Sequence, residues 1–204
     1  KVVSGDSGIN EAEQQLAREL QGFGPSSVSR LVGLLDSDNE KIRTFAGYVV
    51  ADLDGLTEAD LDALIRARKR GDGWIPPAIA RIGTPRAIAF LVDDIRRNPE
   101  AQTQVTAALA MAGEKAAPAL AAFFGQHAPI SNKLSQTTGS IFADMGPKAK
   151  IAVRLLLEFA ANQKLPMSNR LGAVAALGSI GLGAAEAVPK LRELAKSDPK
   201  NFPD

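Results

Sequence analysis

The chain lacks cysteine altogether and is poor in the other residues that commonly build catalytic and metal sites. Among its 204 residues there are no Cys, one His, one Trp and one Tyr. Without Cys there can be no disulfide framework, no thiolate nucleophile and no Cys-ligated metal. With a single His, a metal site would have to consist mostly of carboxylates. These absences point away from thiol, disulfide and zinc chemistry.

Neither sign of charge is in excess, and long hydrophobic runs are missing. Lys and Arg number 24 against 23 Asp and Glu, which gives a formal net charge of +1. A dedicated nucleic-acid-binding protein usually carries a basic excess, so this balance argues against that class. The uninterrupted apolar runs are short, which predicts that no segment inserts into a bilayer. No signal peptide is visible, and both a cytoplasmic protein and a mature exported one fit the composition.

Aromatic residues are also scarce, whereas small and helix-favouring residues are abundant. Phe, Trp and Tyr make up 5% of the chain. In contrast there are 34 Ala and 22 Leu, two residues with high helix propensity. The composition therefore predicts an all-α chain whose helices approach one another closely, and no alternating strand pattern competes with that prediction.

Helical segments end at regular intervals along the chain. Apolar helical patterns are followed by a Gly-type stop at Gly24, Asp54, Gly83, Gly113, Gly146 and Gly181. The spacings between successive stops are 30, 29, 30, 33 and 35 residues. Glycine is favoured just past a helix end because that position often needs a positive φ. A period of about thirty residues with two helix-length segments is typical of a helical solenoid.

One face of the helix before each stop is apolar. Counted back from the stop, positions −12, −8, −5, −4 and −1 fall on one stripe of a helix. These positions are apolar nearly throughout, which predicts that the stripe faces the core. Position −3 is small in every period, and we expect helices of adjacent repeats to approach closely there. The residues at position −3 are Ala51, Ala80, Ala110, Ala143 and Gly178.

Several stretches within this pattern resemble a known repeat family. They are 175–181 (AALGSIG), 187–191 (AVPKL), 116–120 (AAPAL) and 36–43 (DSDNEKIR). These stretches resemble the HEAT-like repeats of the phycobilisome-lyase type, found widely in bacteria. The resemblance covers residues 9–196 as a single domain. It implies a right-handed α-solenoid of stacked antiparallel helix pairs, with about six repeats and roughly twelve helices.

The two ends of the predicted array are irregular. Residues 1–8 would form an N-terminal tail, and 197–204 a C-terminal tail or the start of a further repeat. Residues 9–23 look like the second helix of a pair without the first, and 184–196 like a first helix without the second. The chain does not begin with Met, so we expect a fragment or a processed product. The unpaired helices predict apolar edges and end-to-end self-association, or a longer natural chain.

Four sequence features could support catalysis or ligand binding, and each has a simpler structural explanation. His127 lies near a helix end, and the spacing identifies no Ser or Asp partner for it. Residues 36–39 (DSDN) lack the later ligands of a calcium loop, and capping of the next helix explains them. Residues 71–73 (GDG) could cradle an anion with their N–H groups, but no nucleotide-loop element accompanies them. The basic run 66–70 (RARKR) suits the last turn of a helix, although a phosphate or an acidic partner could contact it. We therefore predict no catalytic residue, metal or cofactor.

A second stripe on the same helices carries the aromatic residues. Positions −13, −10, −9, −6 and −2 lie about 120° from the core stripe and would line the concave surface of a solenoid. The only Trp and the only Tyr fall on it in neighbouring repeats. These rings either fill gaps around the irregular helix at Pro76 and Pro77 or anchor a partner. The partner-binding candidates are Lys41, Phe45, Tyr48, Asp52, Arg70, Trp74, Pro77, Arg81 and Gln104.

The sequence thus favours a non-catalytic scaffold that binds a protein or peptide on its concave face. The aromatic residues would be the anchors, and the cations would orient acidic groups of the partner. Some members of the resembled family attach bilins to phycobiliproteins, so a bilin lyase or tetrapyrrole chaperone is an alternative, with Glu100, Lys133 and Asp144 as its nearest candidates. Nucleic-acid binding is the last alternative, because the second stripe is mixed in sign.

Overall fold

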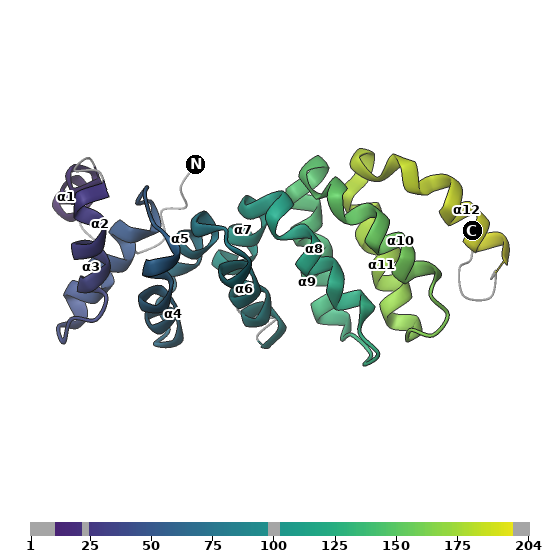
Figure 1. Cartoon of the computed structure of the whole chain (residues 1–204), viewed down its shortest axis with the longest axis horizontal. Coiled ribbons are helices and arrows are strands. Elements are labelled where there is room, and N and C mark those ends of the chain that lie inside the picture. The colour runs from purple at the N-terminus through teal and green to yellow at the C-terminus, as the bar shows by residue number, and fades with distance from the viewer. Residues whose placement is uncertain (1–10, 22–24, 98–102, 198–204) are drawn as a thin grey trace. The chain divides into compact units, whose positions relative to one another are not determined.

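The computed structural model describes residues 11–21, 25–97 and 103–197, and in these ranges the chain consists mainly of helices joined by short loops (Figure 1). No strand occurs in the described ranges, so the all-α prediction is confirmed there. Four features of the sequence lie outside the described residues: the predicted tail over 1–8, the stop at Gly24, Glu100, and residues 198–204.

Twelve α-helices and five 3-10 segments follow one another in the described part of the chain. The α-helices are α1 (Glu11–Gln21), α2 (Pro25–Leu34), α3 (Glu40–Ala51), α4 (Leu61–Lys69), α5 (Ile75–Ile82), α6 (Pro85–Arg97), α7 (Thr103–Ala112), α8 (Ala117–Ala121), α9 (Asn132–Met145), α10 (Val153–Ala161), α11 (Met167–Ile180) and α12 (Val188–Ser197). The 3-10 segments are η1 (Glu58–Asp60), η2 (Gly113–Lys115), η3 (Ala122–Gly125), η4 (Gly146–Ala152) and η5 (Gly181–Ala187).

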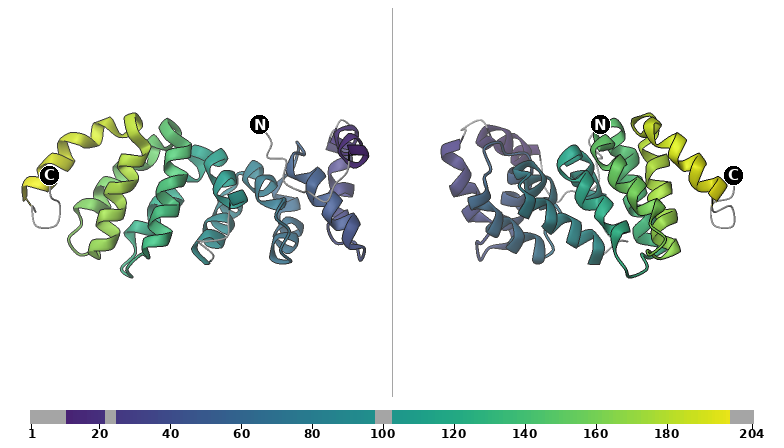
Figure 2. Two further views of the ribbon diagram at one scale, coloured as in Figure 1. Left: turned by 180° about the vertical axis from the view of Figure 1, so that it is seen from behind. Right: turned by 45° about the vertical axis from the view of Figure 1, so that its right-hand side comes forward.

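The described residues form two compact units that divide between Ala87 and Ile88. In the first unit α3 packs against α1, α2 and α5, and α4 packs against α2 and α5 (Figure 1). In the second unit α9 packs against both α7 and α11, and α11 also packs against α10. The green helices α9, α10 and α11 lie side by side in both views of Figure 2. The single array over 9–196 remains a prediction.

The predicted core stripe is buried in both units. In α9 all five of its positions are buried, from Leu134 to Met145, and the same holds in α11 from Asn169 to Ile180. The main exception is Ile42, which is 40% exposed in the first turn of α3. Burial of this stripe against neighbouring helices is the main source of stability for such short helices. The helical phase inferred from the sequence is therefore confirmed for these helices.

Glycine occupies the helix ends with the backbone conformation expected there. Gly83, Gly113, Gly146 and Gly181 all have φ between 52° and 63°. At the second stop the positive φ, 87°, belongs to Gly55 and not to Asp54. The expectation for Asp54 is thus corrected, because a side chain at positive φ brings Cβ close to the backbone and glycine avoids that cost.

The row of small residues at position −3 divides between the two units. Ala51 and Ala80 are buried in the first unit, as expected. In the second unit Ala143 and Gly178 are exposed, and a Cβ added at Gly178 would meet nothing within 4 Å. The expected close approach is wrong at these two positions. Alanine at Ala143 is explained by its high helix propensity on an exposed face.

One helical stretch, Met167–Ser197, is long and apolar enough to cross a membrane by length and composition alone. It spans 31 residues and contains α11, η5 and α12. However, α11 packs against α9 and α10, and the polar Asn169 and Arg170 are buried in it. Packing in the second unit thus accounts for the apolar face of α11, and the expectation of no membrane insertion remains a prediction.

The last described helix exposes apolar side chains, in agreement with the predicted edge. No residue of α12 is buried, and Val188 is exposed. Leu191 and Leu194 are half-buried, whereas Leu182 in the preceding η5 is 93% exposed. The self-association that this edge predicts remains a prediction.

Candidate binding site in the first unit

A tight loop between α4 and α5 forms the centre of the candidate site. The chain leaves α4 after Lys69, and Gly71 turns it with φ 101°. Helix α5 then begins with Pro76 and Pro77 in its first turn, where a missing N–H costs no helical hydrogen bond. The helix is short, with only 8 residues, in agreement with the irregular helix expected at Pro76 and Pro77. Trp74 is thereby held directly before the helix.

Three backbone N–H groups of this loop, those of Gly71, Asp72 and Trp74, donate hydrogen bonds within the chain. The Gly71 N–H donates to the Arg68 carbonyl at 3.0 Å, and the Asp72 N–H donates to the Ala67 carbonyl at 3.3 Å. The Trp74 N–H donates to Asp72 Oδ1 at 2.9 Å. These three N–H groups are therefore not available to an external anion. The Asp72 carboxylate itself accepts the hydrogen bond from the Trp74 N–H.

A cavity of about 290 Å³ opens beside the loop. Its walls come from the end of α2, the first turns of α3, the end of α4 and the loop before α5. The lining residues are Leu35, Glu40, Arg43, Thr44, Ala67, Arg70, Gly71, Asp72, Gly73 and Trp74. Two of them, Arg70 and Trp74, were predicted from the second stripe.

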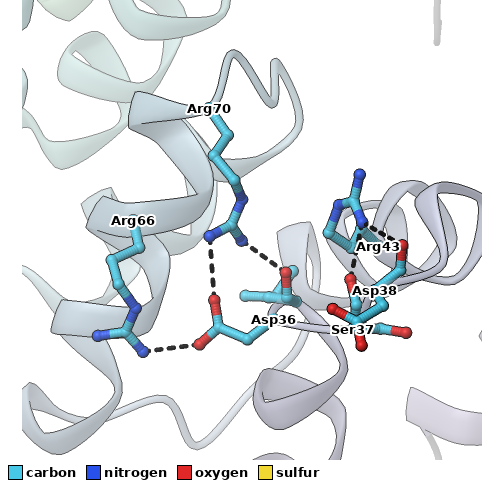
Figure 3. Close-up of polar contacts among 7 residues, drawn as sticks. Asp36, Ser37, Asp38, Arg43, Arg66 and Arg70 are labelled. Atoms are coloured by element: carbon cyan, nitrogen blue, oxygen red, sulfur yellow. Dashed lines mark hydrogen bonds and ion pairs between the residues drawn. The ribbon is translucent and has the colours of Figure 1, made fainter.

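Arg66 of α4 and Arg70, the residue after that helix, are both bound to one carboxylate of the first unit (Figure 3). Asp36 accepts from Arg66 Nη2 at 2.7 Å through Oδ2, and from Arg70 Nη1 at 3.0 Å through Oδ1. Arg70 Nη2 also donates to the Leu35 carbonyl at 2.6 Å. The hydrogen bond from Arg66 holds the pKa of Asp36 below its ordinary value, and Arg70 acts in the same direction. Part of the basic run is therefore paired within the chain.

Residues 36–39 cap and brace α3, as the capping interpretation predicted. The Asn39 side chain accepts a hydrogen bond from the Lys41 N–H at 3.0 Å. Arg43 Nη1 donates to the Ser37 and Asp38 carbonyls at 2.7 and 3.0 Å (Figure 3). Within the described ranges no group of three or more His, Cys, Asp or Glu side chains could hold a metal ion.

The structure brings together two of the three predicted aromatic anchors. The Tyr48 and Trp74 ring centroids lie 5.4 Å apart with an interplanar angle of 85°, an edge-to-face pair. Both side chains are half-buried, as is Phe45, which does not belong to this ring pair. Such rings are neither fully exposed anchors nor a sealed core, so they combine support of α5 with a surface open to a partner.

The remaining predicted residues lie in different surroundings. Arg81 Nη2 pairs with Asp52 Oδ1 at 2.7 Å on the surface of the first unit. Lys41 is exposed on α3 and Pro77 is half-buried in α5. Gln104 is exposed on α7 in the second unit and is not assigned to this site. Arg70 and Arg81 thus have carboxylate partners within the chain, and their role toward acidic groups of another molecule stays a prediction.

Asp72 is the residue of the site that sequence reasoning did not identify as a binding residue. Its side chain lies against Gly47 of α3, where an added Cβ would be 2.3 Å from Asp72 Oδ2. Burial raises the pKa of Asp72, and the Trp74 N–H, Arg70 and Arg68 only partly oppose this. Its position between two glycines and two residues before Trp74 was the available signal.

We expect Asp72→Asn to raise the stability of the protein at neutral pH. The folded-state pKa of Asp72 is raised, so its ionised form costs free energy above that pKa, whereas an amide keeps the oxygen that accepts from Trp74. The gain should shrink as the pH falls through the folded pKa towards the ordinary value, because Asp72 then becomes neutral. Urea denaturation of both proteins at pH 7 and pH 4 tests this. A variant less stable at pH 7 would contradict it.

Comparison of the chain with protein-family models and with curated protein sequences finds no match. The functional argument therefore depends on the geometry. Of the residues considered for tetrapyrrole chemistry, Lys133 and Asp144 are exposed on α9 and Glu100 lies outside the described residues. His127 is exposed between η3 and α9. Lys133, Asp144 and His127 are not among the residues that line the cavity of the first unit.

Proposed function

We propose that the chain is a HEAT-like repeat protein that binds a peptide segment of a partner protein through its first unit. The packing of alternate helices supports the repeat assignment: α1, α3 and α5 form one row of contacts, and α2 and α4 form another. The same alternation joins α7, α9 and α11 in the second unit. Two rows of helices in each unit are what stacked antiparallel pairs of a right-handed α-solenoid require.

The observation that carries the binding proposal is the Tyr48–Trp74 pair beside the cavity. Half-buried Trp and Tyr rings supply a large contact area at low entropic cost, and such residues dominate the binding energy of many interfaces. The Arg81–Asp52 and Arg70–Asp36 ion pairs place charged groups on the same unit. An aromatic centre with polar surroundings is the usual anatomy of a specific interface.

The proposal is tested by peptide display against the full chain, with counter-selection on the Trp74→Ala variant. We expect enriched peptides whose Kd for the unmodified chain rises about 30-fold in Trp74→Ala, measured by calorimetry. Met111→Ala is the matched control, because Met111 is large, 49% exposed and on α7 in the second unit. Its effect on Kd should be less than about twofold. Failure to enrich peptides, or equal binding by Trp74→Ala, would contradict the proposal.

A further inference from the structure

We propose that the cavity beside Trp74 is a subsite for one cationic side chain, Lys or Arg, of the bound peptide, with Asp72 as its carboxylate partner. The inference rests on the proposed function for the peptide, but the cation subsite is testable by itself. The bound side chain would be positively charged, whereas the basic residues of the sequence suggested acidic groups on the partner.

The carboxylates that line the cavity have unused capacity to accept hydrogen bonds. Arg43 is bonded to the Ser37 and Asp38 carbonyls, and Arg70 to Asp36 and the Leu35 carbonyl. In contrast, neither lining carboxylate, Asp72 or Glu40, has an ion pair among the residues that the structure describes. A carboxylate can accept about four hydrogen bonds, and Asp72 accepts one, from the Trp74 N–H. The cavity thus holds two carboxylates that form no ion pair with a described residue, beside Arg43, whose guanidinium is bonded to backbone carbonyls.

The surroundings of Asp72 favour a cation over a neutral donor. The indole of Trp74 lines the same cavity, and an ammonium or guanidinium group is attracted to the face of an aromatic ring. Asp72 is half-buried, so an ion pair formed there is screened less than one on the open surface. Thr44 adds a hydroxyl acceptor to the lining. An anion would find the Gly71, Asp72 and Trp74 N–H groups already occupied and the Asp72 charge repulsive.

The size of the cavity limits what it can hold. At about 290 Å³ it lies at the lower end of the roughly 300–1,000 Å³ of small-molecule sites. The volume suits the end of one long side chain and excludes a folded element. The Tyr48–Trp74 pair would then contact the adjoining residues of the peptide. Binding of the isolated side chain alone is expected to be weak, in the millimolar range.

The first test uses the full, isotope-labelled chain and small probes observed by NMR. The probes are the N-acetyl methylamides of lysine and arginine, with that of glutamate as the charge control. We expect saturable shifts of the Trp74 indole N–H and of the Gly71 and Gly73 amides with both cations, weakened by added salt. The absence of saturable shifts with either cation would overturn the proposal, as would equal shifts with the glutamate probe.

Two variants and a control test the role of Asp72. Asp72→Asn should weaken cation binding about tenfold, because a charge-assisted hydrogen bond is lost while the loop bond to Trp74 is kept. Gly47→Ala should also weaken it, because the new Cβ would lie 2.3 Å from Asp72 Oδ2 and must displace the carboxylate. Asp54→Asn, an exposed carboxylate outside the cavity lining, should leave it unchanged. Unchanged cation binding in Asp72→Asn would overturn the proposal.

The outcomes separate this inference from the proposed function. If display yields Trp74-dependent peptides without Lys or Arg at any shared position, the cation subsite is wrong while peptide binding stands. If no peptide is enriched but the lysine and arginine probes bind in an Asp72-dependent manner, the subsite stands and the peptide proposal is wrong.

Discussion

Replacing Asn169 by alanine should lower the free energy of unfolding by about 2–4 kcal/mol. Asn169 is fully buried at the start of α11, and its amide joins that helix to the segment before α9. Oδ1 accepts from the Ile130 N–H at 2.8 Å, and Nδ2 donates to the Gln126 and Ala128 carbonyls at 2.8 and 3.1 Å. A single side chain therefore satisfies three backbone groups of one connection.

The size of this loss in the free energy of unfolding follows from how deeply the three backbone groups are buried. The hydrogen bond at Ile130 is buried, so alanine at 169 leaves its N–H without a partner, which costs about 1–3 kcal/mol. The two carbonyls are only partly buried and can regain water, so they add less. The matched control is Asn162→Ala, because the side chain of exposed Asn162 accepts a single hydrogen bond from the described residues, from the nearby Lys164 N–H at 3.0 Å. It should cost less than about 1 kcal/mol.

Urea denaturation followed by circular dichroism measures both asparagine variants. Asn169→Asp provides a further check, since it keeps the acceptor, loses the donors and buries a charge, and should be at least as destabilising as alanine. A cost below that of Asn162→Ala would mean that the segment 126–130 is not held by this amide.

Two glycines of the same helix should respond to alanine with opposite signs. In α11 a Cβ added at Gly172 would lie 2.5 Å from Phe124 Cε1 and 2.9 Å from Ser135 Oγ. Phe124 is fully buried and cannot move away freely, so overpacking should cost about 1–3 kcal/mol in Gly172→Ala. Gly178 is exposed with nothing within 4 Å of the added atom, and Gly178→Ala should gain up to about 1 kcal/mol of helix propensity.

The comparison is informative because both variants make the same chemical change in one helix. Denaturation midpoints at equal m-values measure the difference, which should be about 3 kcal/mol between the two variants. Equal midpoints would show that α11 does not approach η3 and α9 as closely as described. A stabilised Gly172→Ala would mean the same.

Helix periodicity made the core predictable, because burial of one stripe depends only on the spacing of apolar residues within a helix. Ile141 and Phe142 of α9 follow that rule, and so do Ala173 and Leu177 of α11. The row at position −3 lies at the margin of the stripe. Whether it is buried depends on the angle between neighbouring helices, so Ala51 is buried and Ala143 is exposed.

Contacts between helices that lie about one predicted period apart in the sequence could be predicted only in part. Arg66 bonds Asp36 across 30 residues and Arg81 bonds Asp52 across 29. Both separations match the repeat period, so opposite charges one period apart were the available signal. Asp72 gave no such signal, because its burial arises from Gly47 of the neighbouring helix and from the turn at Gly71. The spacing of residues within one helix cannot predict this contact between Asp72 and Gly47, because the two residues belong to different elements.

Collisional quenching of Trp74 fluorescence tests the central claim most directly, because Trp74 is the only indole in the chain. Its half-buried ring beside the cavity predicts that acrylamide reaches it in the free protein and that a selected peptide protects it. An emission that acrylamide cannot quench in the free chain would mean a sealed, gap-filling ring. Quenching that stays the same in the complex would place the peptide elsewhere, and either result would contradict a binding site at Trp74.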